Sequence, residues 1–258
     1  MGVVNVSIPH AFAVWNRNLA QYRRTWKLSI LPNFFEPILY LVAIGIGVGA
    51  YISEMNGTTY VAFLAPGLVA VAAMNGASYE ATYNVFVRLN FEKTYDSMLT
   101  TPVQPEDLLI GEVLWAVTRS VIYGVSFFIV IAAFGLAPMP GALLAIPLVP
   151  LTGLLFATIG IVFSLQIPSM NVFSFYFTLF IMPLFLFSDI FFPIAERLSG
   201  VWLRAAEVLP LLHPVRLMRA AFGGEISWIL LWDLAYIVVA SGSLLAIAMR
   251  MTRRRLSS

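Results

Sequence analysis

The chain has 258 residues, of which 60% are hydrophobic and 11% are charged, and its mean hydropathy is +0.88. Soluble domains carry roughly 25% charged residues, so this composition excludes an ordinary soluble fold, and a net charge of +2 gives no indication of a nucleic-acid partner. The absence of cysteine excludes disulfides, thiolate nucleophiles and cysteine-bound metals. Long apolar runs favour membrane-spanning helices over barrel strands.

Residues 7–27 predict an amphipathic helix. Large apolar residues recur at steps of three and four, namely Phe12, Trp15, Leu19, Tyr22 and Trp26. Polar and basic residues fill much of the remaining circumference. Because aromatic side chains favour the level of the lipid head groups, we expect this helix to lie in the plane of the membrane surface. It lacks the apolar stretch and cleavage site of a signal peptide.

Six apolar stretches follow, each long enough to cross a bilayer as a helix. They are residues 30–52, 60–87, 108–135, 141–166, 171–192 and 226–249. Prolines within them predict bends that neighbouring helices must accommodate, at Pro37, Pro66, Pro147, Pro150 and Pro183. Residues 1–258 are therefore expected to form a single all-α integral membrane domain.

The positions of lysine and arginine predict the orientation. With the N-terminus inside, 11 of the 15 basic residues lie on the cytoplasmic side or near it. The other four, Arg197, Arg204, Arg216 and Arg219, share one segment before the last span, where acidic residues accompany them. Cytoplasmic loops carry an excess of Lys and Arg, so both termini are expected to face the cytoplasm.

Two connections are long enough to contain structure of their own. Residues 88–107 lie on the cytoplasmic side and predict a short helix, a turn, and a new helix that begins at Pro105. Residues 193–225 lie outside and are half apolar, so they predict two short helices that re-enter the outer leaflet. Backbone at that depth is tolerated only against protein or a water-filled cavity.

Five stretches, taken in order, carry a resemblance to a known family. They are FEPILYLVAIGIGVG at 35–49, YVAFLAPGLVAVAAMNGASYEATYNVF at 60–86, EKTYDSMLTTPVQPEDLLIGEVLWA at 92–116, FYFTLFIMPLFLFSDIFFP at 175–193 and LPLLHPVRLMRAAFGG at 209–224. Together they resemble the permease subunits of ABC-2 type transporters, in the branch of nodulation-factor and other lipo-oligosaccharide exporters. Drug-efflux permeases of the same superfamily share the architecture and the last stretch.

The resemblance implies a division of labour between chains. The sequence has no GxxxxGK[ST] phosphate loop, so ATP would be bound by separate ATPase subunits, two of them paired with two copies of this chain. Residues 92–102 would form the coupling helix, flanked by the helix at 8–27; the alternative is that both are solvated connectors. The expected contacts with the ATPase are Lys93, Thr94, Tyr95, Asp96, Met98, Leu99, Thr100 and Thr101.

Ionisable residues within apolar spans cost roughly 2.5–3.5 kcal/mol on insertion scales and are functional candidates. Four qualify, namely Glu36, Glu80, Asp189 and Asp233. Glu80 lies on a polar face of the second span. This face borders a substrate path, contacts the partner subunit or makes a hydrogen-bonded packing contact with another helix. The fifth span is rich in aromatic rings, which either pack structurally or guide sugar rings and acyl chains. The candidate path residues are Glu80, Asn75, Asn84, Phe177 and Phe180.

No catalytic residues, cofactor site or metal site are predicted. His213 and His10 are the only histidines, and His213 is expected to form a hydrogen bond in the external segment. The function expected from the resemblance is export of an amphipathic glycolipid or lipo-oligosaccharide across a bacterial inner membrane. Export of a drug or a polysaccharide is the alternative within the family. A proton-coupled transporter that uses Glu80, or an intramembrane enzyme, is less well supported because no relay or catalytic constellation is present.

Overall fold

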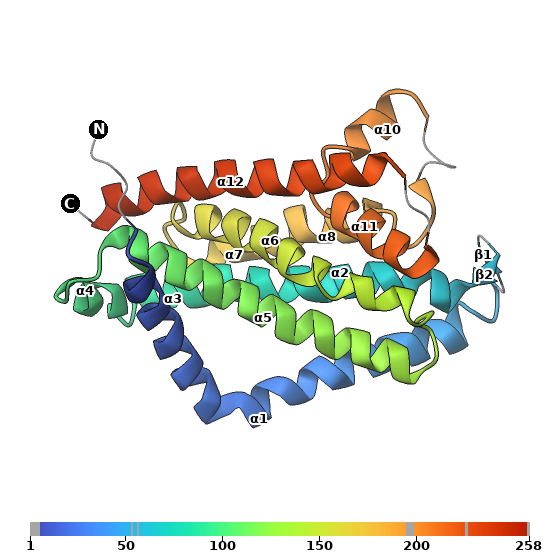
Figure 1. The fold of residues 1–258 in the computed structure, drawn as a ribbon, viewed down its shortest axis with the longest axis horizontal. Helices are drawn as coiled ribbons and strands as arrows, with labels where there is room; N and C mark the ends of the chain where they lie inside the picture. Colours follow the sequence, from blue (N-terminus) through green and yellow to red (C-terminus); the bar gives the residue numbers. More distant parts are fainter. Residues whose placement is uncertain (1–5, 53, 56, 195–198, 225–226, 257–258) are drawn as a thin grey trace.

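The structure is a computed structural model that describes residues 6–52, 54–55, 57–194, 199–224 and 227–256. Long helices run roughly along the long axis of the molecule (Figure 1). Within the described residues, six helical segments are long and apolar enough to cross a membrane, which confirms the predicted all-α integral membrane fold. These spans are Ser29–Gly47, Tyr60–Asn90, Pro105–Ala133, Gly141–Ser164, Met170–Phe187 and Ile229–Leu256.

The first helix, α1 (Ile8–Gly47), is one continuous helix of 40 residues. It joins the surface helix predicted at 7–27 to the first span, which ends at Gly47 rather than at residue 52. Figure 1 shows a sharp bend between these two parts. Pro32 lies inside α1, and a proline ring clashes with the carbonyl four residues earlier and removes its hydrogen bond. This accounts for a bend at the junction.

The N-terminal part of α1 packs against α5 (Pro105–Ala133). Its buried face includes Ala11 and Val14, so the contact is centred one position away from the predicted aromatic stripe. The two helices approach each other closely at Gly111 of α5, which has no side chain. A Cβ added to Gly111 would lie only 2.5 Å from the Cβ of Val14, so Val14 and not the aromatic stripe occupies the contact. Trp15 sits beside this contact, and its indole nitrogen donates a hydrogen bond to the hydroxyl of Thr118 at 2.9 Å.

The second span is the centre of the bundle. In its most apolar stretch 83% of the residues are buried, against 17% in the first and last spans and 22% in the fifth. The exposed apolar faces of those outer spans require lipid or another subunit to cover them. The second span consists of α2 (Tyr60–Tyr79), a π-helical turn (Glu80–Asn84) and α3 (Val85–Asn90).

The remaining spans differ in regularity. The third is the single helix α5, and the last is the single helix α12 (Ile229–Leu256). The fourth consists of a 3₁₀ turn (Gly141–Ala145) and α6 (Leu148–Ser164). The fifth consists of a 3₁₀ turn (Met170–Val172), α7 (Phe173–Phe175), a π-helical turn (Tyr176–Ile181) and α8 (Met182–Phe187).

The two ends of the bundle carry different elements (Figure 1). Both ends of the chain and the short helix α4 (Thr94–Leu99) lie at one end, which we call the α4 end. The short antiparallel strands β1 (Glu54–Met55) and β2 (Thr58–Thr59) and the helix α10 (Val201–Ala206) lie at the opposite end, which we call the hairpin end. An even number of spans places both ends of the chain on the same side.

Within the described residues, the segment predicted to re-enter the membrane contains two short helices. They are α10 and α11 (Leu212–Gly223); residues 195–198 and 225 of this segment lie outside the described residues. α11 packs against α2, α6 and α12. Val215 and Met218 are fully buried in this contact, so α11 is an integral part of the bundle at the hairpin end.

Candidate functional site

The predicted coupling segment has the expected form, a short helix, a turn and a new helix start at Pro105. α4 begins after Lys93, whose left-handed backbone (φ 47°) reverses the chain. The next helix is capped by Asp107, whose carboxylate accepts hydrogen bonds from the backbone of Gln104 at 3.1 Å and of Ser7 at 2.6 Å. The start of α5 is thereby tied to the N-terminal residues of the chain.

Seven of the eight predicted ATPase contacts are at least partly accessible, and one is not. Lys93, Asp96, Thr100 and Thr101 are exposed, and Thr94, Met98 and Leu99 are half-buried. The side chain of Tyr95 is 2% exposed and points into the protein, so its assignment as a surface contact is corrected. An α-helix of six residues places one side inward, and Tyr95 occupies that side.

Tyr95 lies beside a group of charged residues that we call the charge network, namely Glu80, Arg88, Glu112 and Arg119. Burial, and then the Glu112 carboxylate beside it, raise the pKa of the Tyr95 hydroxyl well above its ordinary value of 10. The phenol therefore keeps its proton. Tyr95 thus fastens the otherwise exposed helix α4 to the interior of the bundle.

Arg88 is the centre of the charge network. Its guanidinium lies 2.6 Å from the carboxylate of Glu80 and 2.5 Å from that of Glu112, and all three residues are buried. Glu80 also accepts a hydrogen bond from the amide of Asn84 at 2.8 Å, and Arg119 lies 3.6 Å away. These contacts join the second span to the third.

The geometry supports a packing role for Glu80. Its carboxylate is held by two arginines and one amide, and it begins the π-helical turn of the second span. Turns of this kind inside α-helices occur frequently at functional sites. The sequence reasoning named Glu80 but missed Glu112, although Glu112 also lies within the predicted third span and met the same criterion.

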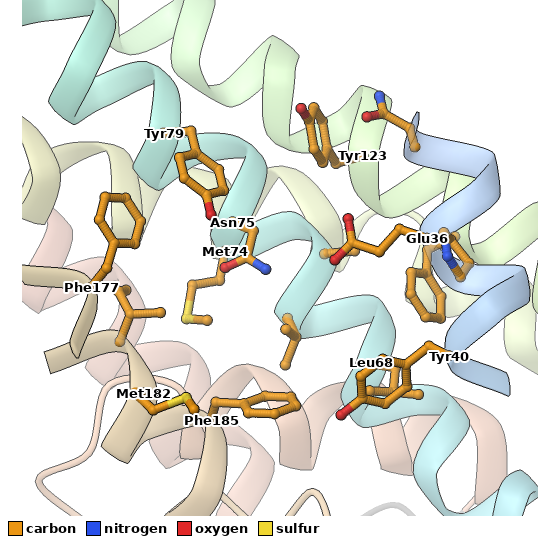
Figure 2. Close-up of a pocket in the computed structure, with 16 residues that line it drawn as sticks. Glu36, Tyr40, Leu68, Met74, Asn75, Tyr79, Tyr123, Phe177, Met182 and Phe185 are labelled. Atoms are coloured by element: carbon orange, nitrogen blue, oxygen red, sulfur yellow. The ribbon is translucent and has the colours of Figure 1, made fainter. Parts of the chain in front are cut away.

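A cavity of about 340 Å³ lies between α1, α2, α5 and the fifth span (Figure 2). Its lining is mostly apolar and aromatic, and it includes two of the predicted path residues, Asn75 and Phe177. Figure 2 shows Glu36 and Asn75 projecting into it from facing helices. Its polar side chains are Asn33, Glu36, Tyr40, Asn75, Tyr79 and Tyr123.

The other predicted path residues lie elsewhere. Glu80 and Asn84 line a smaller, polar cavity of about 170 Å³ towards the α4 end. Phe180 lines neither cavity, and its ring packs instead against Tyr176 at 5.4 Å between centroids. The structure therefore divides the predicted path residues between two cavities and a packing contact.

One helix face borders both cavities. Seven residues of α1 follow one another at steps of three or four, and we call them the polar stripe. The first four line the smaller cavity and the last three line the larger one. They are Asn18, Tyr22, Thr25, Ser29, Asn33, Glu36 and Tyr40.

The ABC-2 type transporter family matches residues 9–222, which is more than half of the chain. The chain belongs to the ABC-2 type transporter family. The match covers the first five spans and ends within α11.

Individual relatives of this ABC-2 protein come from several bacteria. Nodulation protein J of Rhizobium leguminosarum bv. trifolii is 38% identical over 213 residues, which is 83% of this chain and 81% of the relative. Nodulation protein J of Bradyrhizobium diazoefficiens is 36% identical, over 80% of this chain and 79% of the relative. The inner membrane transport permease YadH of Escherichia coli is 24% identical, over 82% of each chain. The chain is accordingly a multi-pass transport permease.

The hairpin end of the permease contains a second buried polar cluster. His213 forms hydrogen bonds, as predicted, and is also fully buried, with Asp233 at 2.7 Å and the carbonyl of Glu207 at 3.0 Å on its two ring nitrogens. Carboxylate and ring atoms of these three residues lie within 4.8 Å of one another. Arg216 lies 2.6 Å from Glu207 and 3.4 Å from Asp233, so one guanidinium already pairs with both carboxylates, and no metal ion is assigned.

Asp189, the remaining intramembrane candidate, also has a structural partner. Arg219 of α11 lies 3.2 Å from its carboxylate, and the same guanidinium covers the ring of Phe63 at 3.9 Å. This pair fastens α11 to the end of the fifth span and to α2.

Proposed function

We propose that the chain is the permease subunit of an ATP-driven exporter in a bacterial inner membrane. Two copies pair with each other and with two separate ATPase subunits, since this sequence carries no P-loop. ATP binds to those partners, and the permease contributes the path. α4 is its coupling helix.

The attachment of α4 is the observation that carries this proposal. α4 is accessible on one side and fastened on the other through Tyr95 to the charge network. The charge network includes Glu80, which begins the π-helical turn of the most buried span. A force applied to α4 by a partner is therefore transmitted to the second span through packed and charged groups rather than through a loose loop.

The proposed cargo is an amphipathic glycolipid or lipo-oligosaccharide. The similarity to nodulation protein J over most of both chains supports this cargo class. The larger cavity offers apolar walls together with a carboxylate, two amides and three phenols, which suits a molecule that has both a lipid and a polar part. A drug or a polysaccharide remains the alternative within the same family.

A proton-coupled mechanism is less well supported. A proton carrier needs a carboxyl group that can release its proton to a path, and Glu80 is instead held by Arg88, Arg119 and Asn84. Replacement of Glu80 by Gln is expected to weaken packing without causing uncoupled proton flow. Uncoupled proton flow across vesicles that contain the Glu80→Gln permease would instead favour a proton-coupled secondary transporter.

The test uses the permease purified together with its ATPase. The complex is reconstituted in vesicles, and ATP hydrolysis and ATP-dependent movement of a fluorescent lipo-oligosaccharide are measured. We expect the cargo to stimulate hydrolysis and to accumulate only with ATP. A permease that purifies alone, or that moves the cargo without an ATPase, would overturn the proposal.

A further inference from the structure

The larger cavity contains a buried polar group that no other part of the described protein satisfies. Asn33 is 3% exposed, and neither its amide nitrogen nor its amide oxygen has a hydrogen-bond partner among the described residues. Its side chain lines the cavity. Buried amides are almost always hydrogen-bonded, so this one indicates a ligand that both donates and accepts hydrogen bonds.

Glu36 gives the cavity its charge. It lies one helical turn beyond Asn33 on α1 and projects into the cavity (Figure 2). Among the described residues no arginine, lysine or histidine forms an ion pair with Glu36, and none lines this cavity. An anionic ligand is therefore disfavoured by repulsion, and a neutral or cationic one is accepted.

Aromatic faces supply the remaining walls. The rings of Tyr79 and Phe177 are stacked with centroids 4.8 Å apart, and Tyr40 meets Phe185 edge-on at 6.3 Å. A sugar ring has apolar C–H faces that pack on such rings and a rim of hydroxyls that both donate and accept. The amide, carboxylate and phenols of this cavity are suited to that rim.

We propose that this cavity binds one sugar ring of the cargo, neutral or amine-bearing, and excludes a phosphorylated or sulfated ring. Asn33 contacts the ring hydroxyls or an amide substituent, and Glu36 sets the charge preference. The inference rests on the proposed function for its cargo. The polar stripe of α1 borders both this cavity and the polar one near the α4 end, so the same helix face would offer polar contacts to a sugar ring in either cavity.

The experiment measures binding of three defined probes to the permease–ATPase complex in nanodiscs. The probes are radiolabelled hexyl β-glucoside, its 2-amino-2-deoxy analogue and its 6-phosphate, with binding to empty nanodiscs subtracted. The unmodified complex is expected to bind the first two and to bind the phosphate at least about tenfold more weakly. Equal binding of all three would overturn the charge preference.

Two variants assign the site. Asn33→Leu is expected to weaken binding of the glucoside and the amino-glucoside by about tenfold, the loss of roughly one buried hydrogen-bonding group. Glu36→Gln is expected to weaken glucoside binding less than Asn33→Leu does, because the Gln amide still forms hydrogen bonds with hydroxyls. It should also remove any preference for the amine and reduce the difference in affinity between the glucoside and its phosphate. Asn171→Leu and Glu54→Gln make the same chemical changes at exposed positions outside the cavity and are the matched controls.

A third, smaller substitution distinguishes a loss of binding from a loss of folding. Tyr40→Phe removes only a hydroxyl from the lining and is expected to weaken glucoside binding severalfold while the complex stays assembled. If all three variants bind every probe like the unmodified complex, or if they change only the association of two copies, the cavity is not a sugar site. Failure of the proposed function looks different, because no ATPase would then co-purify and no ATP-dependent transport would be seen.

Discussion

At the scale of single residues, the charge network is the feature with the largest expected effect on stability. Two carboxylates, Glu80 and Glu112, share the one guanidinium of Arg88 in a buried position. Replacing a buried ion pair by apolar groups can be nearly neutral, but removing one partner leaves an uncompensated charge. Arg88 is therefore the residue whose loss is hardest to compensate.

Arg88→Met tests this directly. It leaves two buried carboxylates facing each other, so we expect a loss of about 3–5 kcal/mol in the free energy of unfolding. Thermal unfolding of the purified protein in detergent is the measurement. The control is Arg250→Met at an exposed position of α12, which is expected to unfold at the wild-type temperature. Equal unfolding temperatures for both variants would mean that the network contributes nothing.

At the scale of elements, the sequence predicted six spans and a coupling helix because apolar length and proline–acid helix starts are local signals. It did not predict that α1 is continuous, since residues 7–27 and 30–52 were considered as separate elements. That separation also hid the polar stripe, which crosses the junction from Asn18 to Tyr40. The π-helical turn at Glu80–Asn84 was not predicted either, because the contacts with Arg88 and Arg119 that accompany it are tertiary.

The bend of α1 can be tested through Pro32. Restoring the missing backbone hydrogen bond with Pro32→Ala is expected to straighten the helix. Because the chain has no cysteine, spin labels at Phe12→Cys and Ile46→Cys report the distance along α1 without background. A straight helix would place these positions about 50 Å apart, so the distance should rise towards that value in the variant. An unchanged distance would attribute the bend to the contact between α1 and α5.

The accessible side of α4 can be tested at Leu99. Leu99→Asp adds a charge where an apolar contact with the ATPase is proposed, so we expect affinity for the ATPase to fall by at least about tenfold. The unfolding temperature should not change, because Leu99 is only half-buried. Met139→Asp, an exposed apolar position at the hairpin end, is the control and should bind the ATPase normally. Normal binding by Leu99→Asp would remove α4 from the interface.

At the scale of the whole molecule, the sequence predicted that both ends of the chain share a side, and the bundle agrees (Figure 1). Which cavity each path residue would line could not be predicted, because Asn75 and Glu80 lie only five positions apart in the second span, and the other walls of each cavity come from residues distant in sequence. The pairing of His213 with Asp233 joins residues 20 positions apart. Such contacts follow from how helices cross, which local patterns do not encode.

The side on which the α4 end lies is the last prediction. Lys93 precedes α4, Arg17 donates a hydrogen bond to the Thr94 hydroxyl of α4 at 3.4 Å, and Arg254 lies in the last turn of α12, which ends at the α4 end (Figure 1). An excess of basic residues marks the cytoplasmic side of membrane proteins. Single cysteines at Asp96 and Trp202, both exposed, are placed in the cysteine-free chain and treated with a membrane-impermeant maleimide. In intact cells Trp202→Cys should react and Asp96→Cys should not, and inverted membrane vesicles should reverse this pattern. Labelling of Asp96→Cys in intact cells would place α4 out of reach of a cytoplasmic ATPase, and the basic residues would then need another explanation.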